Sequence, residues 1–238
     1  MKESIEKLKE MVEDSDNIVF FGGAGVSTES GIPDFRGTDG LYHQQWRYPP
    51  EVILSHSFYE SNPDEFFRFY RAKLLMPDAK PNAAHAKLAE LEKRGKLRAV
   101  ITQNIDGLHQ AAGSKNVLEL HGSVLRNYCE KCGKFYGLDF MLHSEGVPHC
   151  TCGGRIKPDV DLYEEALNGN VLNRAVRVIA QADLLIIGGT SLNVYPAAGL
   201  IRYYCGNKLV LINKTAVAQD LSADMVITDP IGETLAQI

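Results

Sequence analysis

The sequence contains no apolar run close to the roughly 20 residues that a membrane-spanning helix needs. Its first residues, MKESIEKLKEMVEDSDN, are charged from residue 2 onward and contain no signal-peptide core. Positive charge is not in excess either, because 25 Lys and Arg residues stand against 30 Asp and Glu residues, and the net charge is -5. We therefore expect a cytoplasmic protein that neither enters a membrane nor binds nucleic acid directly.

Cysteine is scarce, and most of it is clustered. Four of the 5 cysteines lie between Cys129 and Cys152, while Cys205 stands alone. In a chain without a secretory signal, such a cluster favours metal binding over disulfides. The sequence also lacks tandem repeats and low-complexity tracts. With 238 residues and 45% apolar content, it can form one large domain, or a large domain with inserts.

Short, continuous apolar runs alternate with helical patterns along the chain. Residues 3–14 form an amphipathic pattern that predicts a helix, and NAAHAKLAELEKR and VLNRAVRVIAQA are similar. The predicted strands are NIVFF at 17–21, AVIT at 99–102, LLII at 184–187, LVLI at 209–212 and VIT at 226–228. Apolar strands that alternate with helices predict an α/β fold, a Rossmann-like parallel sheet with helices on both faces.

Two stretches interrupt this alternation. Residues 38–80 are rich in aromatics and prolines, and residues 126–157 contain the cysteine cluster. We expect them to form a small domain, made of a helical insertion and a zinc ribbon. The Rossmann-like domain then comprises residues 1–37, 81–125 and 158–238.

A glycine-rich turn follows the first predicted strand, in FFGGAGVSTESGIPDFRG. Gly23 and Gly25 allow positive φ and close backbone approach, as in turns that bind a dinucleotide pyrophosphate. Thr28 stands in place of the usual third glycine, and no acidic residue follows about 20 positions on, which disfavours a dehydrogenase. A tight turn that binds no ligand is the alternative. The PDFRG segment that follows is suited to folding over a cofactor and excluding water.

A second group of polar residues lies in TQNIDGLHQAAG and LELHG. His121 follows the apolar run VLEL, which places it at a strand end, where its neutral form can act as a general base. An ordinary structural histidine is the alternative, and we prefer that interpretation for His109. Asn104 and Asp106 suit a carboxamide and ribose hydroxyls, or an Asx turn that caps the next helix.

The cysteine cluster, Cys129-x2-Cys132 and Cys150-x-Cys152, resembles a zinc ribbon. Four thiolates form a closed tetrahedral site, so we expect one structural Zn²⁺ that takes no part in catalysis. The short second spacing makes His149 an alternative ligand, and two disulfides are a further alternative.

Together these motifs resemble the sirtuins, the NAD-dependent protein lysine deacylases, of bacterial type. GAGVSTESGIPDFRG, TQNIDGLH, LHG, the paired cysteines, GTSLNVYPA and LVLIN match in the same order between about Ile18 and Asn213. The resemblance implies NAD as co-substrate and acetylated-lysine proteins or peptides as partners, and leaves the oligomeric state open. It implies a deacetylase that cleaves nicotinamide from NAD and yields free lysine and O-acetyl-ADP-ribose.

The resemblance also assigns residues. It implies that His121 is the catalytic base and that Asn104 and Asp106 act with it at the nicotinamide and its ribose. The expected NAD contacts are Gly23, Ala24, Gly25, Thr28, Asp34, Phe35, Arg36, Gln103, Asn104, Ile105, Asp106, Gly189, Thr190, Ser191 and Asn213. The expected peptide contacts are Val160, Asp161, Leu162, Asn193 and Val194, and the expected zinc ligands are Cys129, Cys132, Cys150 and Cys152.

The sequence departs from the sirtuin pattern at two places. Gly22 stands where many sirtuins have threonine, and Asp161 stands where an apolar residue is common beside the acyl-lysine tunnel. Desuccinylase-type sirtuins carry tyrosine and arginine where this sequence has Phe67 and Tyr70, so we expect deacetylation in preference to desuccinylation. The alternatives are ADP-ribosyl transfer to a protein from the same cleft, and a non-catalytic zinc-ribbon protein that senses NAD.

Overall fold

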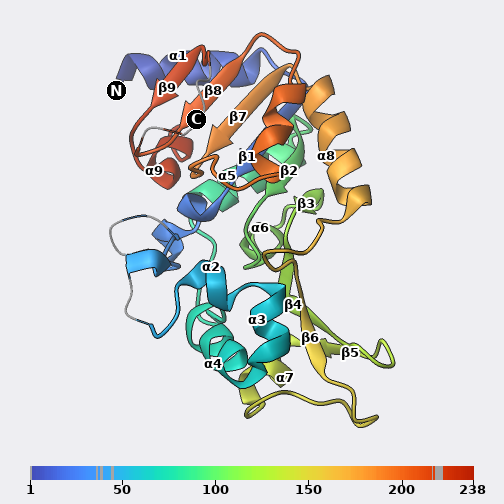
Figure 1. Cartoon of the computed structure of the whole chain (residues 1–238). Coiled ribbons are helices and arrows are strands. Elements are labelled where there is room, and N and C mark those ends of the chain that lie inside the picture. The colour runs from blue at the N-terminus through green and yellow to red at the C-terminus, as the bar shows by residue number, and fades with distance from the viewer. Residues whose placement is uncertain (1, 36, 38–39, 44–45, 216, 218–221) are drawn as a thin grey trace.

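The computed structural model describes most of the chain and contains two β-sheets (Figure 1). The described residues are 2–35, 37, 40–43, 46–215, 217 and 222–238. Arg36, one of the expected cofactor contacts, lies outside them.

The larger sheet has six parallel strands in the order β3-β2-β1-β7-β8-β9. The strands are β1 Ile18–Gly22, β2 Leu97–Thr102, β3 Val117–Glu119, β7 Leu184–Gly188, β8 Leu209–Ile212 and β9 Met225–Ile227. The predicted parallel sheet is thus confirmed. The chain builds one half outward from β1 and the other half outward from β7, so the strand order changes direction between these two central strands.

The alternation of side chains along β1 explains why both faces of this sheet are buried. Ile18 and Phe20 join the apolar cluster on one face, and Val19 and Phe21 join the cluster on the other. The first face is covered by α1 Lys2–Glu13, α5 Ala83–Lys93 and α9 Ile231–Leu235, and the second by α8 Gly169–Gln181 and the 3₁₀-helix η4 Ala197–Tyr203. No helix in the described part of the chain is long and apolar enough to cross a membrane.

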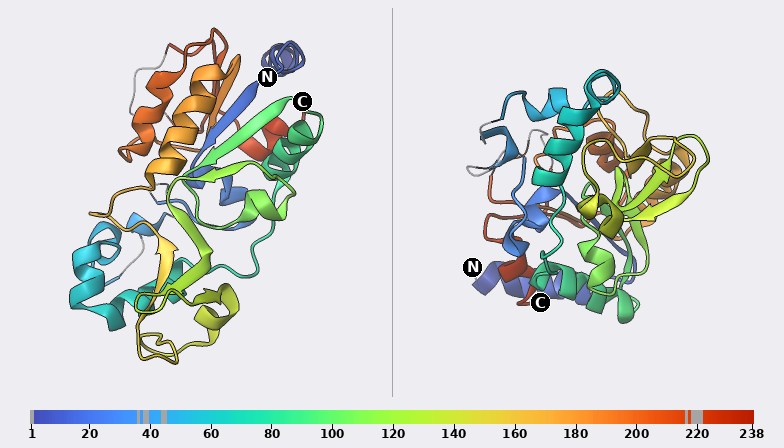
Figure 2. Two further views of the ribbon diagram at one scale, coloured as in Figure 1. Left: turned by 90° about the vertical axis from the view of Figure 1, so that its right-hand side faces the viewer. Right: turned by 90° about the horizontal axis from the view of Figure 1, so that it is seen from below.

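The smaller sheet is antiparallel, with the order β5-β4-β6, and lies with several short helices at the other end of the molecule (Figures 1 and 2). Its strands are β4 Gly122–Cys129, β5 Phe135–Gly137 and β6 Ile156–Val160, and the helices are α2 Pro50–Ile53, α3 His56–Ser61, α4 Pro63–Lys73 and α7 Leu138–His143. One apolar cluster joins these segments, including Tyr59, Phe66, Phe67, Val124 and Ile156. Both predicted insertions contribute to this cluster, although β4 and β6 extend across the predicted boundaries, which stay a prediction.

Gly122 lies where the chain passes from one sheet to the other. It is the first residue of β4, and only two residues separate it from the end of β3. Its φ is +76°, and a Cβ atom there would lie 1.9 Å from the carbonyl oxygen of Asp159 on β6. Only glycine fits a left-handed backbone with a neighbour this close. The pairing of β4 with β6 therefore requires glycine at this position.

We expect Gly122→Ala to lower the free energy of unfolding by about 3 kcal/mol or more, because the methyl group adds a collision to the backbone strain. Gly95→Ala is the matched control, since Gly95 has φ +78° but no atom within 4 Å of the added Cβ. That variant should lose only about 1 kcal/mol. Urea denaturation measures both changes, and equal losses in the two variants would contradict this account.

Candidate functional site

The three polar motifs meet at the carboxyl ends of β1, β2 and β7, where a parallel sheet binds its ligands. The amide N of Gly25 donates to the carbonyl O of Gly189 at 2.8 Å. Nε2 of Gln103 donates to Oγ1 of Thr190 at 2.9 Å. The turns after β1, β2 and β7 are therefore joined to one another, as their positions in the sequence predict.

Close packing explains the glycines of the turn after β1. A Cβ atom at Gly25 would lie 2.8 Å from Cα of Gly189, and one at Gly23 would lie 2.9 Å from Cβ of Thr190. The φ of Gly23 is -136°, so close approach, and not positive φ, requires glycine there. A Cβ at Gly22 would lie 2.5 Å from Cε1 of Phe20, which shows that core side chains fill the space beside this residue.

Two short 3₁₀-helices, η1 Ala24–Val26 and η2 Thr28–Ser30, follow this turn in place of a long helix. Oγ1 of Thr28 donates to the carbonyl O of Gly25 at 3.0 Å. Further on, Oδ1 of Asp34 accepts from the amide of Gly37 at 2.7 Å, and Phe35 packs against the apolar cluster of the smaller sheet. The segment after β1 is thus an irregular loop between the two sheets, as its glycines and proline predict.

A hydrogen-bonded network lies beneath this loop. Oγ of Ser27 donates to Oδ2 of Asp106 at 2.7 Å, and Nδ2 of Asn104 donates to Oγ of Ser27 at 3.1 Å. The other carboxylate oxygen of Asp106 accepts from the amide of Leu108 at 2.9 Å, which forms an Asx turn just before α6 Leu108–Ala111. Asn104, in contrast, binds Ser27. Our list of candidate residues missed Ser27, although it lies within the quoted motif.

His121 lies two residues beyond the end of β3. This is the position at a strand end that the sequence predicts. Its Nδ1 is 3.0 Å from the carbonyl O of Gln103. A carbonyl oxygen only accepts hydrogen bonds, so Nδ1 carries the proton and Nε2 keeps a lone pair. Burial lowers the pKa of His121 below its ordinary value, and the hydrogen bond with Gln103 opposes this effect. The imidazole is therefore neutral at pH 7 and able to accept a proton.

The expected peptide contacts come from two segments. Val160 and Leu162 are buried in the apolar cluster of the smaller sheet, whereas Asn193 is exposed and Val194 half-buried in the segment after β7. Asp161 is half-buried, and its amide N donates to the carbonyl O of His121 at 3.1 Å. Burial, followed by the nearby carboxylate of Glu165, raises the pKa of Asp161.

The remaining expected cofactor contacts lie beside the turns already described. Gly189 N donates to the carbonyl O of Ile212 at 3.1 Å, which brings Asn213 next to the turn after β7. The side-chain amide of Asn213 donates through Nδ2 to the carbonyl O of Thr215 at 2.7 Å. Ala24 and Ser191 are half-buried in their turns, and Ile105 packs against the cluster of the smaller sheet.

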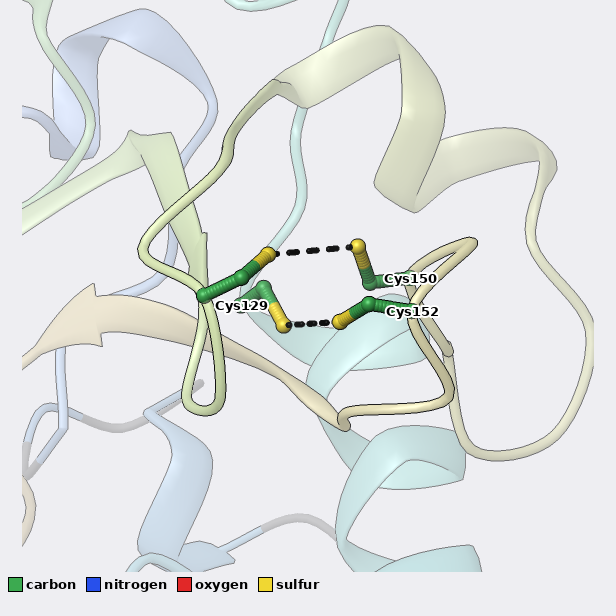
Figure 3. A group of neighbouring side chains, drawn as sticks. Cys129, Cys150 and Cys152 are labelled. Carbon is green, nitrogen blue, oxygen red and sulfur yellow. Dashed lines mark hydrogen bonds between the residues drawn. The ribbon is translucent and has the colours of Figure 1, made fainter.

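The four clustered cysteines fit a metal ion (Figure 3). Their sulfurs lie within 4.8 Å of one another, with 3.5 Å between Cys129 and Cys152 and 3.7 Å between Cys132 and Cys150. A tetrahedral Zn²⁺ with Zn–S bonds of about 2.3 Å places its sulfurs roughly 3.8 Å apart. All four are free thiols, so the disulfide alternative is wrong for this structure. The exposed His149 bonds to the carbonyl of Val147 and is not part of the cluster.

The acidity of Cys150 also suits a metal site, whereas hydrogen bonds with the neighbouring sulfurs raise the pKa of Cys132 to about 12. The amide N–H of Cys152, which donates to the Cys150 sulfur, is the largest influence that lowers the pKa of Cys150 to about 5. A thiolate is the form that binds zinc. The arrangement is a closed site of four sulfur ligands, which is typical of structural zinc.

Comparison with known proteins identifies similar sequences over the whole chain. The model of the Sir2 family matches residues 23–196. The chain is 61% identical over 242 residues to the NAD-dependent protein deacetylase of Clostridium perfringens, covering 100% of this chain and 99% of that protein. It is 58% identical over 240 residues to the NAD-dependent protein deacetylase of Clostridium acetobutylicum, covering 99% and 98%.

Solved structures are similar in fold as well. A Sir2 structure with a deacetylated p53 peptide and 3′-O-acetyl-ADP-ribose has a TM-score of 0.91 and 38% identity, covering 98% of this chain and 96% of that chain. A Sir2 structure with a p53 peptide and NAD⁺ has a TM-score of 0.86 and 40% identity, covering 97% and 95%.

We expect Cys150→Ser to lose bound zinc and to lower the free energy of unfolding by about 3 kcal/mol or more, because Cys150 is also buried in the apolar core of the smaller sheet. The wild-type chain should contain one zinc per molecule, measured by elemental analysis together with a thermal melt. The exposed Cys205 lies outside the cluster, so Cys205→Ser is the control and should keep both properties. Full zinc content in Cys150→Ser would contradict the assignment.

Proposed function

The chain belongs to the Sir2 family, and on that premise we infer that it is an NAD-dependent protein deacetylase whose general base is His121. The enzyme removes acetyl groups from lysine side chains of proteins or peptides and consumes NAD. With one water molecule, which completes the release of the lysine, its products are the free lysine, nicotinamide and O-acetyl-ADP-ribose. The observation that carries the assignment of the base is the hydrogen bond between Nδ1 of His121 and Gln103, because it leaves Nε2 able to accept a proton.

NAD, when bound, supplies a ribose carbon that takes the acyl oxygen as nicotinamide leaves. Asn104 and Asp106 hold the nicotinamide and its ribose, and the turn of Gly23, Ala24 and Gly25 faces the pyrophosphate. The anchoring of Asn104 and Asp106 by Ser27 supports this arrangement, because their side chains have fixed directions. The other proposed NAD contacts are Thr28, Gln103, Ile105, Gly189, Thr190, Ser191 and Asn213.

His121 accepts a proton from a ribose hydroxyl, which makes that oxygen a better nucleophile toward the acyl carbon. Its lowered pKa keeps it neutral, and hence ready to accept, at pH 7. Asp34 and Phe35, together with Arg36, cover the nicotinamide end and exclude water. The packing of Phe35 against the apolar cluster of the smaller sheet supports this role.

The acetyl-lysine peptide lies between β6 and the segment after β7, where Val160, Asp161, Leu162, Asn193 and Val194 contact it. β6 is at the edge of the three-stranded sheet, which is where an extended peptide can add as a further strand. The absence of direct nucleic-acid binding and the cytoplasmic location stay predictions.

Two other functions would use the same residues. ADP-ribosyl transfer to a protein requires the same cleavage of NAD, and a labelled ADP-ribose group would then remain on protein. An NAD sensor without activity requires no base, so the orientation of His121 argues against it.

We expect His121→Ala to reduce deacetylation by at least about 100-fold, because a positioned general base contributes about 10² to 10⁴. Mass spectrometry of an acetyl-lysine peptide, with and without NAD, measures peptide deacetylation and O-acetyl-ADP-ribose together. His143→Ala is the control, since His143 is exposed on α7. Deacetylation at the wild-type rate in His121→Ala would show that another residue is the base, and ADP-ribose on protein would favour the transferase.

We expect acetyl-lysine peptides to be converted at least about tenfold faster than succinyl-lysine peptides, because the succinyl carboxylate finds no cation in the site and, if the Asp161 side chain faces the acyl group, is repelled by it. Phe67 and Tyr70 provide no cation to offset this repulsion, and both are buried in the apolar cluster. Asp161→Asn should narrow the difference between the two kcat/KM values. Faster conversion of the succinyl peptide by the wild-type enzyme would contradict the prediction.

A further inference from the structure

Asn82 holds the loop that carries Ser27. Its Nδ2 donates both to the carbonyl O of Val26, at 2.8 Å, and to Oγ of Ser30, at 3.0 Å. These two residues flank Ser27, whose hydroxyl bonds to Asp106 and Asn104. One amide group thus contacts the loop on both sides of the serine.

The direction of the Asn82 side chain is fixed from α5, where Asn82 is the N-cap. Its Oδ1 accepts from the amide of Ala84 at 2.9 Å, which leaves Nδ2 facing the loop. Its backbone N donates to Nδ1 of His85 at 3.2 Å. Because Nδ1 accepts this bond, the neutral ring of His85 carries its proton on Nε2.

His85 is completely buried and packs against His109 on α6, with 4.7 Å between the ring centroids. Nε2 of His85 and both ring nitrogens of His109 have no hydrogen-bond partner among the described residues. Burying polar atoms without partners costs stability, so apolar packing does not explain why imidazoles are present here. α6 follows the Asx turn of Asp106, and the two histidines join the first turns of α5 and α6.

We propose that Asn82 and His85 are positioning residues for NAD: His85 orients Asn82, and Asn82 sets the position of Ser27 and through it that of Asp106 and Asn104. The proposal rests on the proposed function, in which Asp106 and Asn104 hold the nicotinamide and its ribose. Loss of the Nδ2 donor then weakens NAD binding, while the helix cap and the peptide contacts stay intact.

Asn82→Asp separates the two roles of this side chain. Aspartate caps a helix as well as asparagine does, but it has no Nδ2–H to donate to Val26 and Ser30. We expect about a tenfold rise in both the KM for NAD and the Kd for ADP-ribose, measured by calorimetry. The KM for the acetyl-lysine peptide should stay close to that of the wild type.

Two further variants test the role of His85. His85→Asn offers an amide oxygen as acceptor in place of Nδ1 and should keep the KM for NAD within about threefold of the wild-type value. His85→Leu has a similar volume but no acceptor, and should raise the KM for NAD as Asn82→Asp does. Rescue by asparagine but not by leucine identifies the acceptor, and not the bulk of the ring, as the cause.

Asn168→Asp is the matched control, because Asn168 caps α8 through the amides of Asn170 and Val171. It should leave both KM values unchanged. A wild-type KM for NAD in Asn82→Asp would overturn the positioning role, as would an equal rise in the KM values for NAD and peptide. Failure of the wild-type protein itself to bind ADP-ribose would instead overturn the proposed function, and with it this inference.

Discussion

The close approach of two backbone turns, after β1 and after β7, is the constraint on which the site depends. The amide of Gly25 lies 2.8 Å from the carbonyl oxygen of Gly189, and a Cβ atom at Gly189 would lie 2.4 Å from the amide N of Val26. Any larger residue would separate the turns and move Thr190 away from Gln103, to which it is hydrogen-bonded. β1 and β7 are the two central strands, and the strand order changes direction between them. A ligand can therefore bind at this point, between the loops that follow the two strands.

Most polar groups of the site already have fixed directions within the protein itself. Asp106 uses one carboxylate oxygen for α6 and the other for Ser27, so the start of the helix and the loop after β1 share one anchor. The carbonyl of Gln103 selects the tautomer of His121 by accepting from Nδ1. Groups that are oriented in advance require little reorganisation when the reaction begins, which is the main electrostatic contribution to catalysis in enzymes.

The smaller sheet and the short helices beside it bury an apolar cluster of their own among the described residues. Edge-to-face contacts among Tyr59, Phe66 and Phe67 give this core its density. The cysteine cluster lies at one end of the smaller sheet. Two of its cysteines are in the segment where β4 ends, and the other two are in the loop that leads into β6. A zinc ion held by these cysteines would join the loop after β4 to the loop before β6.

The sequence by itself determined the parallel sheet, the place of the three motifs at strand ends and the four zinc ligands, because apolar runs, glycine turns and cysteine spacing are local patterns. It left open whether Asp106 caps a helix or binds a ligand, and the structure assigns its two oxygens to different partners. It also missed Ser27 and Asn82, whose partners lie 79 and 56 positions away. Such pairs depend on strand order and register, which carry no local signal, so only the tertiary structure decided them.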